Sequence, residues 1–509
     1  MHSGWLALIL ILQGLSPAPA HGSSPGPGDD TSHRQAVQGW VADHRQAVLD
    51  ELMAFVSRRN VSGETDAMAE NAAALRLLLE KRGLAAERWD SGGAPYLFAR
   101  LPAEAASPPG KTLVVLFYAH FDGQPVDPAR WTVGSPFTPT LVGRPAQRDA
   151  RLYGRSAADD KGPIIALLSA LDALRAVGLP PTVETRFILD PEEESGSPHL
   201  GTVLEQHAGA LRADMLIFAD GPVHPSGRPT VVFGTRGIIT MRLTVYGPAE
   251  AVHSGHYGNW APNPAEKLAA LLASMKDADG HVRVAGFYDD VRPLSASERH
   301  ALAAVPRIEN RLQDRLLIAR PDGAGRSLQE LINLPSLNVR GLGSGWVGRQ
   351  ARTIVPATAT AEIDLRLVPD VDPLEQVERI KAHARRQGFF VVEKEPGAAV
   401  RRAHSLVVRI THGPGTPAAR TSMDTELSRT LVGAVRRAGT MEPVLLPTLG
   451  GTGPLSHFHK ALGIPVYGVP IANHDDKQHA PDENLRLGNL WDGIVVYASL
   501  LRLRAPGED

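Results

Sequence analysis

The feature that most constrains the fold is an apolar run that ends abruptly in polar residues and recurs along the chain. Residues 112–118 read TLVVLFY, a near-continuous apolar segment typical of a strand buried on both faces. Similar runs occupy residues 184–189, 215–219 and 465–471, and helical patterns separate them. Strands that alternate with helices predict an α/β domain with a mostly parallel sheet covered by helices. Because ligands bind such sheets beyond the carboxyl ends of the strands, the polar residues after each run are candidate site residues.

A second pattern occupies residues 237–416. Within it, residues 238–246 and 361–368 alternate between apolar and polar side chains, as strands do in a sheet with one solvated face. The chain of 509 residues is also too long for one ordinary core. We therefore expect an α+β domain here, inserted between two parts of a catalytic domain, residues 33–236 and 417–505.

The amino terminus has the pattern of a targeting segment. Residues 5–15 are apolar but too few to span a bilayer, and the APA at residues 18–20 is a small-x-small cleavage signal, although no Lys or Arg precedes the apolar stretch. Residues 21–32 have the Gly, Ser and Pro content of a linker. We predict a signal peptide over residues 1–20 and an exported protein, periplasmic or secreted, with no later transmembrane helix.

Cysteine is absent from the sequence, which excludes disulfides, thiolate metal ligands and a cysteine nucleophile. Any metal must therefore be held by His, Asp or Glu side chains. The formal net charge is -2 and no Lys- or Arg-rich run stands out, which argues against a nucleic-acid-binding protein.

Metal-competent side chains follow the four apolar runs, and one more precedes a long apolar stretch that predicts a buried helix. The five are His120, Asp159, Glu194, Asp220 and His479. Imidazoles and carboxylates suit borderline divalent metals such as zinc, and such sites also accept Mn²⁺ or Co²⁺. Five ligands are too many for one tetrahedral zinc, but they suffice for two metals if one carboxylate bridges.

Two further acids have candidate roles in this interpretation. Asp122, two residues after His120, is placed to accept the other ring N–H of that histidine. Glu193 adjoins a ligand without needing to bind metal, so it could take a proton from water as a general base. Simpler explanations exist, since Asp159 and Asp160 could cap a helix and acidic runs are usually solvated, but the position at strand ends favours a site. The histidines predicted to lie outside this site are His404, His457, His459 and His474.

Six motifs, in the order in which they occur, resemble the two-zinc metallopeptidase family of glutamate carboxypeptidase, aminoacylase and carnosinase. They are AHFDGQP at His120, GRSAADDKG at Asp159, EEESGS at Glu193, FADGP at Asp220, HSG at His253 and HAPDE at His479. The resemblance is closest to the carnosinase and nonspecific dipeptidase branch, through HSGHYG at His253, ARTIVP at Ala351 and RLVP at Arg366. It covers nearly all of residues 33–503, and its one departure is Ser156, where many relatives have glycine.

The resemblance implies two zinc ions per subunit and a role for each site residue. One metal is bound by His120 and Asp220, the other by Glu194 and His479, and Asp159 bridges them. Asp122 orients a ligand, Glu193 is the general base, and the peptide bond after Asp159 is cis. The inserted domain would act as a lid and would also form a homodimer.

The same resemblance implies residues that hold a small peptide substrate. His253 would reach into the partner's active site and stabilise the transition-state oxyanion. Arg366 would bind the terminal carboxylate of the substrate, for which a guanidinium is well suited. The further substrate contacts would be Thr353, His412, Gly451 and Thr452.

The predicted function is an exported dinuclear-zinc metallopeptidase that hydrolyses dipeptides or removes the C-terminal residue of short peptides. The alternative within hydrolases is an N-acyl-amino-acid amidohydrolase that uses the same site. A third hypothesis is a metal-free binding protein that kept the fold, and the complete set of ligands together with Glu193 argues against it.

Overall fold

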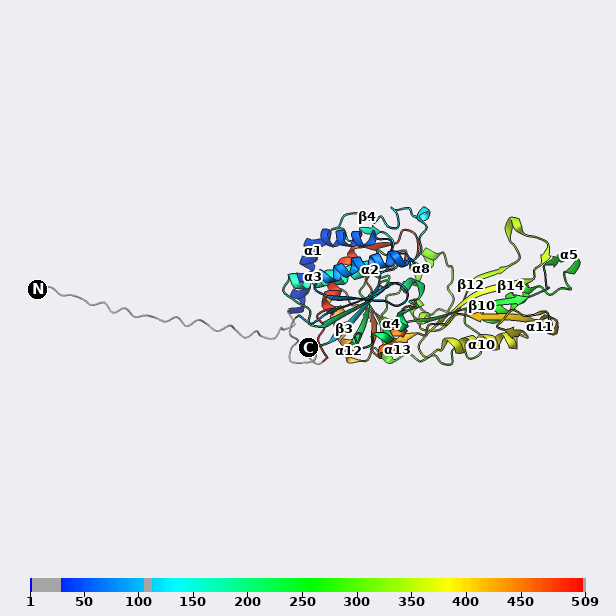
Figure 1. Ribbon diagram of the computed structural model, residues 1–509. Coiled ribbons are helices and arrows are strands. Elements are labelled where there is room, and N and C mark those ends of the chain that lie inside the picture. Colours follow the sequence, from blue (N-terminus) through cyan, green and yellow to red (C-terminus); the bar gives the residue numbers. More distant parts are fainter. Residues whose placement is uncertain (2–28, 105–111, 507–509) are drawn as a thin grey trace.

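The structure is a computed structural model that describes the chain except for residues 2–28, 105–111 and 507–509 (Figure 1). The predicted signal peptide, apart from Met1, and most of the predicted linker lie outside the described residues. The rest folds into an α/β catalytic domain and an inserted domain that projects from it, which confirms the predicted fold class. No helix in the described part of the chain is both long and apolar enough to cross a membrane.

The catalytic domain is built on a sheet of eight strands in the order β1-β2-β6-β3-β7-β19-β8-β18. These strands are β1 (Ala85–Trp89), β2 (Tyr96–Leu101), β3 (Val114–His120), β6 (Glu184–Asp190), β7 (Met215–Phe218), β8 (Thr230–Val232), β18 (Val444–Leu446) and β19 (Val466–Gly468). The four apolar runs of the sequence form the neighbouring strands β6, β3, β7 and β19, which pair in parallel. Their carboxyl ends therefore lie at one edge of the sheet, as predicted.

Strand β3 is buried on both faces, which explains its continuous apolar sequence. Val115 and Phe117 belong to one core, whereas Leu116 and Tyr118 belong to a second core on the opposite face. The helices of the first core are α1 (Asp29–Val56), α2 (Thr65–Glu80), α3 (Lys161–Ala176), α12 (Glu426–Ala438) and α14 (Leu487–Leu500). Those of the second are α4 (Leu200–Gln206) and α13 (Leu455–Leu462). Helix α1 begins inside the range predicted as linker, because Asp, Ser and Thr are common both in linkers and at helix starts.

The inserted domain contains a five-stranded sheet in the order β12-β14-β10-β16-β15. Its strands are β10 (Gly237–Tyr246), β12 (Ser336–Ser344), β14 (Thr358–Leu367), β15 (Phe390–Val392) and β16 (Val407–His412). Helices α6 (Pro264–Ser274) and α10 (Pro373–Arg386) share one core with the apolar side chains of this sheet. The chain enters and leaves the domain side by side, because Ile238 and Thr416 exchange two backbone hydrogen bonds, of 2.9 and 2.8 Å.

Shorter elements complete the fold. The strands of a small antiparallel sheet are β4 (Thr140–Val142), β5 (Arg151–Tyr153) and β20 (Asn484–Arg486). The other short strands are β9 (Gly234–Thr235), β11 (Val252–His253), β13 (Ile354–Val355) and β17 (Ala419–Arg420). The other helices are η1 (Pro128–Arg130), η2 (Glu193–Ser195), α5 (Ser254–Tyr257), α7 (Ala296–Ala304), α8 (Glu309–Leu316), α9 (Leu328–Ile332), η3 (Gly348–Gln350) and α11 (Ala398–Ala403).

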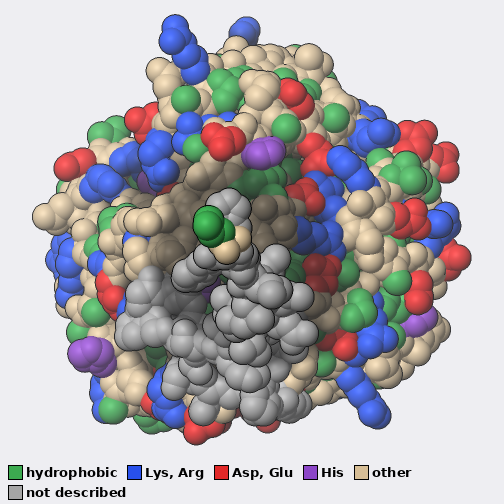
Figure 2. Space-filling model, turned by 90° about the vertical axis from the view of Figure 1, so that its left-hand side faces the viewer, with side chains coloured by type: hydrophobic (Ala, Val, Ile, Leu, Met, Phe, Trp, Pro, Cys, Tyr) green, Lys and Arg blue, Asp and Glu red, His purple; other side chains and the backbone are tan. Residues whose placement is uncertain are grey.

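The surface of the catalytic domain fits the low net charge of the chain. On the face shown in Figure 2, Lys and Arg side chains are interspersed with Asp and Glu side chains outside the grey residues. The described residues on this face form no broad surface of one sign for an extended polyanion, in line with the argument from composition.

Candidate metal centre and active site

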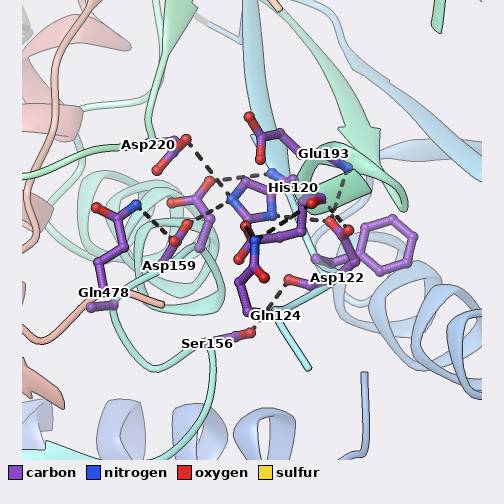
Figure 3. Close-up of polar contacts among 12 residues, drawn as sticks. His120, Asp122, Gln124, Ser156, Asp159, Glu193, Asp220 and Gln478 are labelled. Atoms are coloured by element: carbon purple, nitrogen blue, oxygen red, sulfur yellow. Dashed lines mark hydrogen bonds and ion pairs between the residues drawn. The ribbon is translucent and has the colours of Figure 1, made fainter. Parts of the chain in front are cut away.

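The edge formed by the strand ends brings the five predicted metal ligands together. Figure 3 shows three of them, His120, Asp159 and Asp220, side by side. His120 ends β3, Glu194 lies in η2 after β6, Asp220 follows β7, and His479 lies in the loop after β19, while Asp159 precedes α3. They form two groups, His120 with Asp159 and Asp220, and Asp159 with Glu194 and His479. Within each group the ligand atoms lie within 4.8 Å of one another.

Asp159 is the residue that the two groups share. Its Oδ1 lies 2.8 Å from Nε2 of His120, and its Oδ2 lies 3.2 Å from Nε2 of His479. The first group closes with 3.8 Å between His120 Nε2 and Asp220 Oδ2, and the second with 3.1 Å between His479 Nε2 and Glu194 Oε2. Asp159 therefore presents one carboxylate oxygen to each group, as a bridging ligand must.

The electrostatics of the cluster favour cations. Burial raises the pKa of Asp220 to about 8, and the neighbouring Asp159 carboxylate adds to this effect. Burial also raises the pKa of Glu193, although His120 opposes it. Hydrogen bonds to Asp159 and Glu194 raise the pKa of His479 to about 10. The pKa values of these acids and of His479 are raised because several buried carboxylates lie close together. Divalent cations would neutralise this excess of negative charge.

The donor atoms also fit such cations. They are imidazole nitrogens and carboxylate oxygens, the types that zinc, manganese and cobalt accept. Oδ1 of Asp220 is buried and has no hydrogen-bond partner among the described residues. A buried acceptor without a partner is costly, and a metal ion would satisfy it.

Asp122 contacts His120, as predicted, and also the backbone of the turn η2. The side chain is fully buried, and its Oδ1 lies 3.1 Å from Nδ1 of His120. The same carboxylate accepts the backbone N–H groups of Glu193 and Glu194, each at 3.1 Å. One side chain thus sets the ring of a ligand and the position of the turn η2.

The peptide bond between Asp159 and Asp160 is cis, as the resemblance implies. Asp160 stands at the N-terminus of α3 but makes no capping hydrogen bond with its side chain. Its Oδ2 instead accepts the backbone N–H of His120 at 3.2 Å. The capping explanation for this acidic pair is therefore wrong for Asp160.

A cavity of about 530 Å³ lies against the cluster and reaches the inserted domain. Its lining includes Glu193, Arg366, Gly451 and Thr452. Nη1 of Arg366 donates a hydrogen bond of 2.8 Å to Oγ1 of Thr452. The cavity therefore joins the candidate metal ligands to a guanidinium, which suits a small substrate with a carboxylate.

Three predicted substrate contacts lie away from this cavity within the chain. His253 and Thr353 are exposed and lie next to each other, since Ser254 donates a backbone hydrogen bond of 3.0 Å to Thr353. They are at the base of α5, at the end of the inserted domain remote from β3 (Figure 1). His412 is exposed at the end of β16 and is not among the residues that line the cavity. Within one chain, neither His253 nor Thr353 lines this cavity.

Sequence reasoning missed several residues of the site. The side chain of Gln124 donates a hydrogen bond of 2.8 Å to Oε2 of Glu194, and that of Gln478 donates one of 2.7 Å to Oδ2 of Asp159. Gln124 stands inside the motif AHFDGQP, two residues beyond Asp122, and Gln478 stands one residue before the motif HAPDE, so proximity to the ligands was the available signal. His457 lines the cavity, contrary to the prediction, because α13 packs beside α4 next to the site.

Known peptidases resemble this chain in sequence and in structure. Residues 116–503 match the model of peptidase family M20/M25/M40. The human protein named Beta-Ala-His dipeptidase is 28% identical over 402 residues, which cover 78% of this chain and 76% of the relative. Cys-Gly metallodipeptidase dug1 of Schizosaccharomyces pombe is 26% identical over 426 residues, which cover 83% and 86%. The crystal structure of the M20 family metallo-carboxypeptidase Sso-CP2 from Sulfolobus solfataricus matches with a TM-score of 0.74 and 28% identity, over 90% of this chain and 98% of that chain.

Proposed function

Because the chain belongs to peptidase family M20/M25/M40, we propose that it is an exported metallodipeptidase with two zinc ions, which hydrolyses dipeptides or removes the C-terminal residue of short peptides. The observation that carries the proposal is the pair of ligand groups that share Asp159 beside the cavity. The names of the relatives support peptide bonds as the substrate class. Export rests on the targeting pattern of residues 1–20.

The five ligands are assigned as two sets around the shared carboxylate. His120 and Asp220 hold one cation, Glu194 and His479 hold the other, and Asp159 contacts both. When bound, the cations polarise the scissile carbonyl and lower the pKa of a water molecule. The same donors are compatible with Mn²⁺ or Co²⁺ in place of zinc.

Glu193 is the residue that moves protons in this proposal. It belongs to neither ligand group, yet it lines the cavity next to both. Burial raises the pKa of Glu193, so its carboxylate accepts a proton from water readily and can pass that proton to the leaving amine. Asp122 holds the backbone of Glu193 in place for this transfer.

The other end of the cavity recognises the substrate. The guanidinium of Arg366 lies in the lining with Thr452 and carries a positive charge there. A dipeptide has its free carboxylate one residue beyond the scissile bond, so a guanidinium near the metal ligands fits it. N-acyl amino acids carry the same carboxylate, and substrate assays must separate the two classes.

The test is hydrolysis of a mixed panel of dipeptides, N-acetyl amino acids and N-succinyl amino acids by zinc-loaded and chelator-treated protein. We expect dipeptides to be cleaved, activity to disappear with the metal, and zinc to restore it. Turnover of the acyl amino acids alone would assign the chain to the deacylases instead. No turnover by protein that contains two metal ions per chain would contradict the proposed substrate class.

A homodimer formed through the inserted domain completes this proposal. Strand β12 is one of the two edge strands of its sheet, and Val339 and Leu342 on this strand are exposed. An unpaired edge with apolar side chains favours pairing with another chain. In such a dimer, His253 of one subunit donates a hydrogen bond to the substrate oxyanion in the other.

We expect His253→Ala to lower kcat by about 10²–10³-fold, because one donor to a developing oxyanion contributes that much. The variant should keep its metal content, since His253 lies far from the ligand groups. Steady-state kinetics on the best dipeptide of the panel measure the loss.

A mixed dimer tests whether His253 acts across the interface. Differently tagged His253→Ala and Glu193→Gln chains are coexpressed, and the heterodimer is purified through both tags. If the histidine acts in the partner's site, one of the two sites is complete and about half of the wild-type activity returns. An inactive heterodimer would contradict action across the interface, since both sites would then be defective.

A further inference from the structure

The side chain of Glu483 is fully buried beside the metal centre but belongs to neither ligand group and does not line the cavity. It follows His479 by four residues in the chain. Two loops meet at this carboxylate, the loop that carries Asp159 and the loop that carries His479. The contacts of Glu483 therefore decide how these two ligands are placed relative to each other.

Four donors of the Asp159 loop converge on the Glu483 carboxylate. Oε1 accepts the backbone N–H groups of Ala158 and Asp159, each at 3.1 Å. Oε2 accepts the backbone N–H of Ser156 at 3.1 Å and Nη1 of Arg155 at 2.6 Å. One of these donors is the amide of the shared ligand itself, so the carboxylate holds the backbone of Asp159 directly.

Arg155 and the nearby backbone bind the same loop to the His479 loop. The Arg155 side chain is buried, and its Nη2 donates a hydrogen bond of 3.4 Å to the carbonyl oxygen of Ala480, the residue after His479. The backbone N–H of Gly154 donates a hydrogen bond of 3.0 Å to the carbonyl oxygen of Glu483. Strands β5 and β20 continue this pairing on the far side of the loop. The Asp159 and His479 loops are thus connected by side-chain and backbone hydrogen bonds.

The junction between the two loops, formed by Glu483 and Arg155, requires a carboxylate at position 483. Two oxygens must accept four hydrogen bonds, and an amide would present N–H groups to two of the donors. The buried negative charge in turn needs Arg155, because a buried ion without its partner is strongly destabilising. Catalysis as proposed above uses neither side chain, so their burial at the metal centre calls for another role.

We propose that Glu483 and Arg155 are positioning residues that hold Asp159 and His479 at the separation needed to bind the cation they share with Glu194. The proposal rests on the metal binding assigned above. It predicts that disturbing the junction weakens metal affinity while the ligands themselves remain. Outer residues that orient metal ligands typically contribute 10–100-fold to affinity, and we expect an effect of about this size.

The experiment measures zinc binding by the full-length chain in competition with a chromophoric chelator. Glu483→Gln should bind zinc about 10–100-fold more weakly than the wild type at the weaker of its sites, and excess zinc should restore much of the activity. Asp482→Asn is the matched control. Asp482 is a buried neighbour whose carboxylate accepts the backbone N–H groups of Thr132 and Val133 and the hydroxyl of Thr132, in a loop without ligands. The carboxylate contacts the His479 loop through an ion pair with Lys477 at 3.2 Å, and the carbonyl oxygen of asparagine can still accept from that lysine. This control should bind zinc like the wild type.

The outcomes separate this proposal from the proposed function. A wild-type chain that binds no zinc would contradict the metal centre itself. A wild type with two zinc ions and a folded Glu483→Gln variant of unchanged affinity would refute only the positioning role, as would an equal loss in Asp482→Asn. If Glu483→Gln does not fold, Arg155→Lys takes its place, because lysine keeps the charge but has a single nitrogen in place of the two that Arg155 directs at Glu483 and Ala480. Weaker zinc binding by folded Arg155→Lys would support the proposal, and unchanged binding would overturn it.

Discussion

Glu193→Gln is expected to lower kcat on the best dipeptide substrate by about 10²–10⁴-fold, the range over which a positioned general base contributes. Glutamine has nearly the same shape but cannot accept the proton from water. Metal content should not change, because Glu193 belongs to neither ligand group. The backbone N–H that donates to Asp122 remains in the variant, so the turn η2 should keep its position.

The matched control is Glu192→Gln, one residue earlier in the same acidic run. The carboxylate of Glu192 accepts a hydrogen bond from the backbone N–H of Ala94 and lies 2.8 Å from Nδ1 of His199, away from the ligands. We expect its activity to stay close to that of the wild type. Kinetics together with metal analysis of both variants test the assignment. Wild-type activity in folded Glu193→Gln would remove Glu193 from the mechanism.

Asp159→Asn is expected to abolish activity through loss of metal. Asparagine keeps one carbonyl oxygen but presents an NH₂ group to either His120 or His479, and an amide nitrogen is no ligand for either cation. Each bound cation contributes several kcal/mol of transition-state stabilisation. At 1.36 kcal/mol for each tenfold change in rate, kcat/KM should fall on the order of 10³-fold or more. Zinc content, measured by mass spectrometry, should fall below two ions per chain.

Asp160→Asn is the control for this change, at the other side of the same peptide bond. Burial raises the pKa of Asp160 well above its usual range, and the carbonyl oxygen of asparagine can accept the backbone N–H of His120 as Oδ2 of Asp160 does. It belongs to neither ligand group. The control should retain two zinc ions and most of the activity. Two bound zinc ions in Asp159→Asn would contradict the bridging role.

Much of the architecture and the ligand set could be predicted from local sequence. Residues 112–118 form a near-continuous apolar run because both faces of β3 are buried. The spacing of apolar residues along a strand therefore indicates whether one face or both faces are buried. Four such strands are neighbours and run in parallel, so the polar residues after them had to meet at one edge. This geometric rule, together with the motifs, is why His120, Glu194, Asp220 and His479 could be named before their positions were known.

The sequence by itself therefore determined the fold class, the strands and the candidate ligands, since each depends on residues close together in the chain. Only the tertiary structure decided which distant segments touch. It placed His457 in the cavity wall, gave Asp122 a second role at η2, and put His253 at the far end of the inserted domain. It also joined Arg155 to Glu483, 328 residues apart. A hydrogen bond between distant loops depends on where the whole fold places those loops, and the local spacing of residues in the sequence does not indicate that.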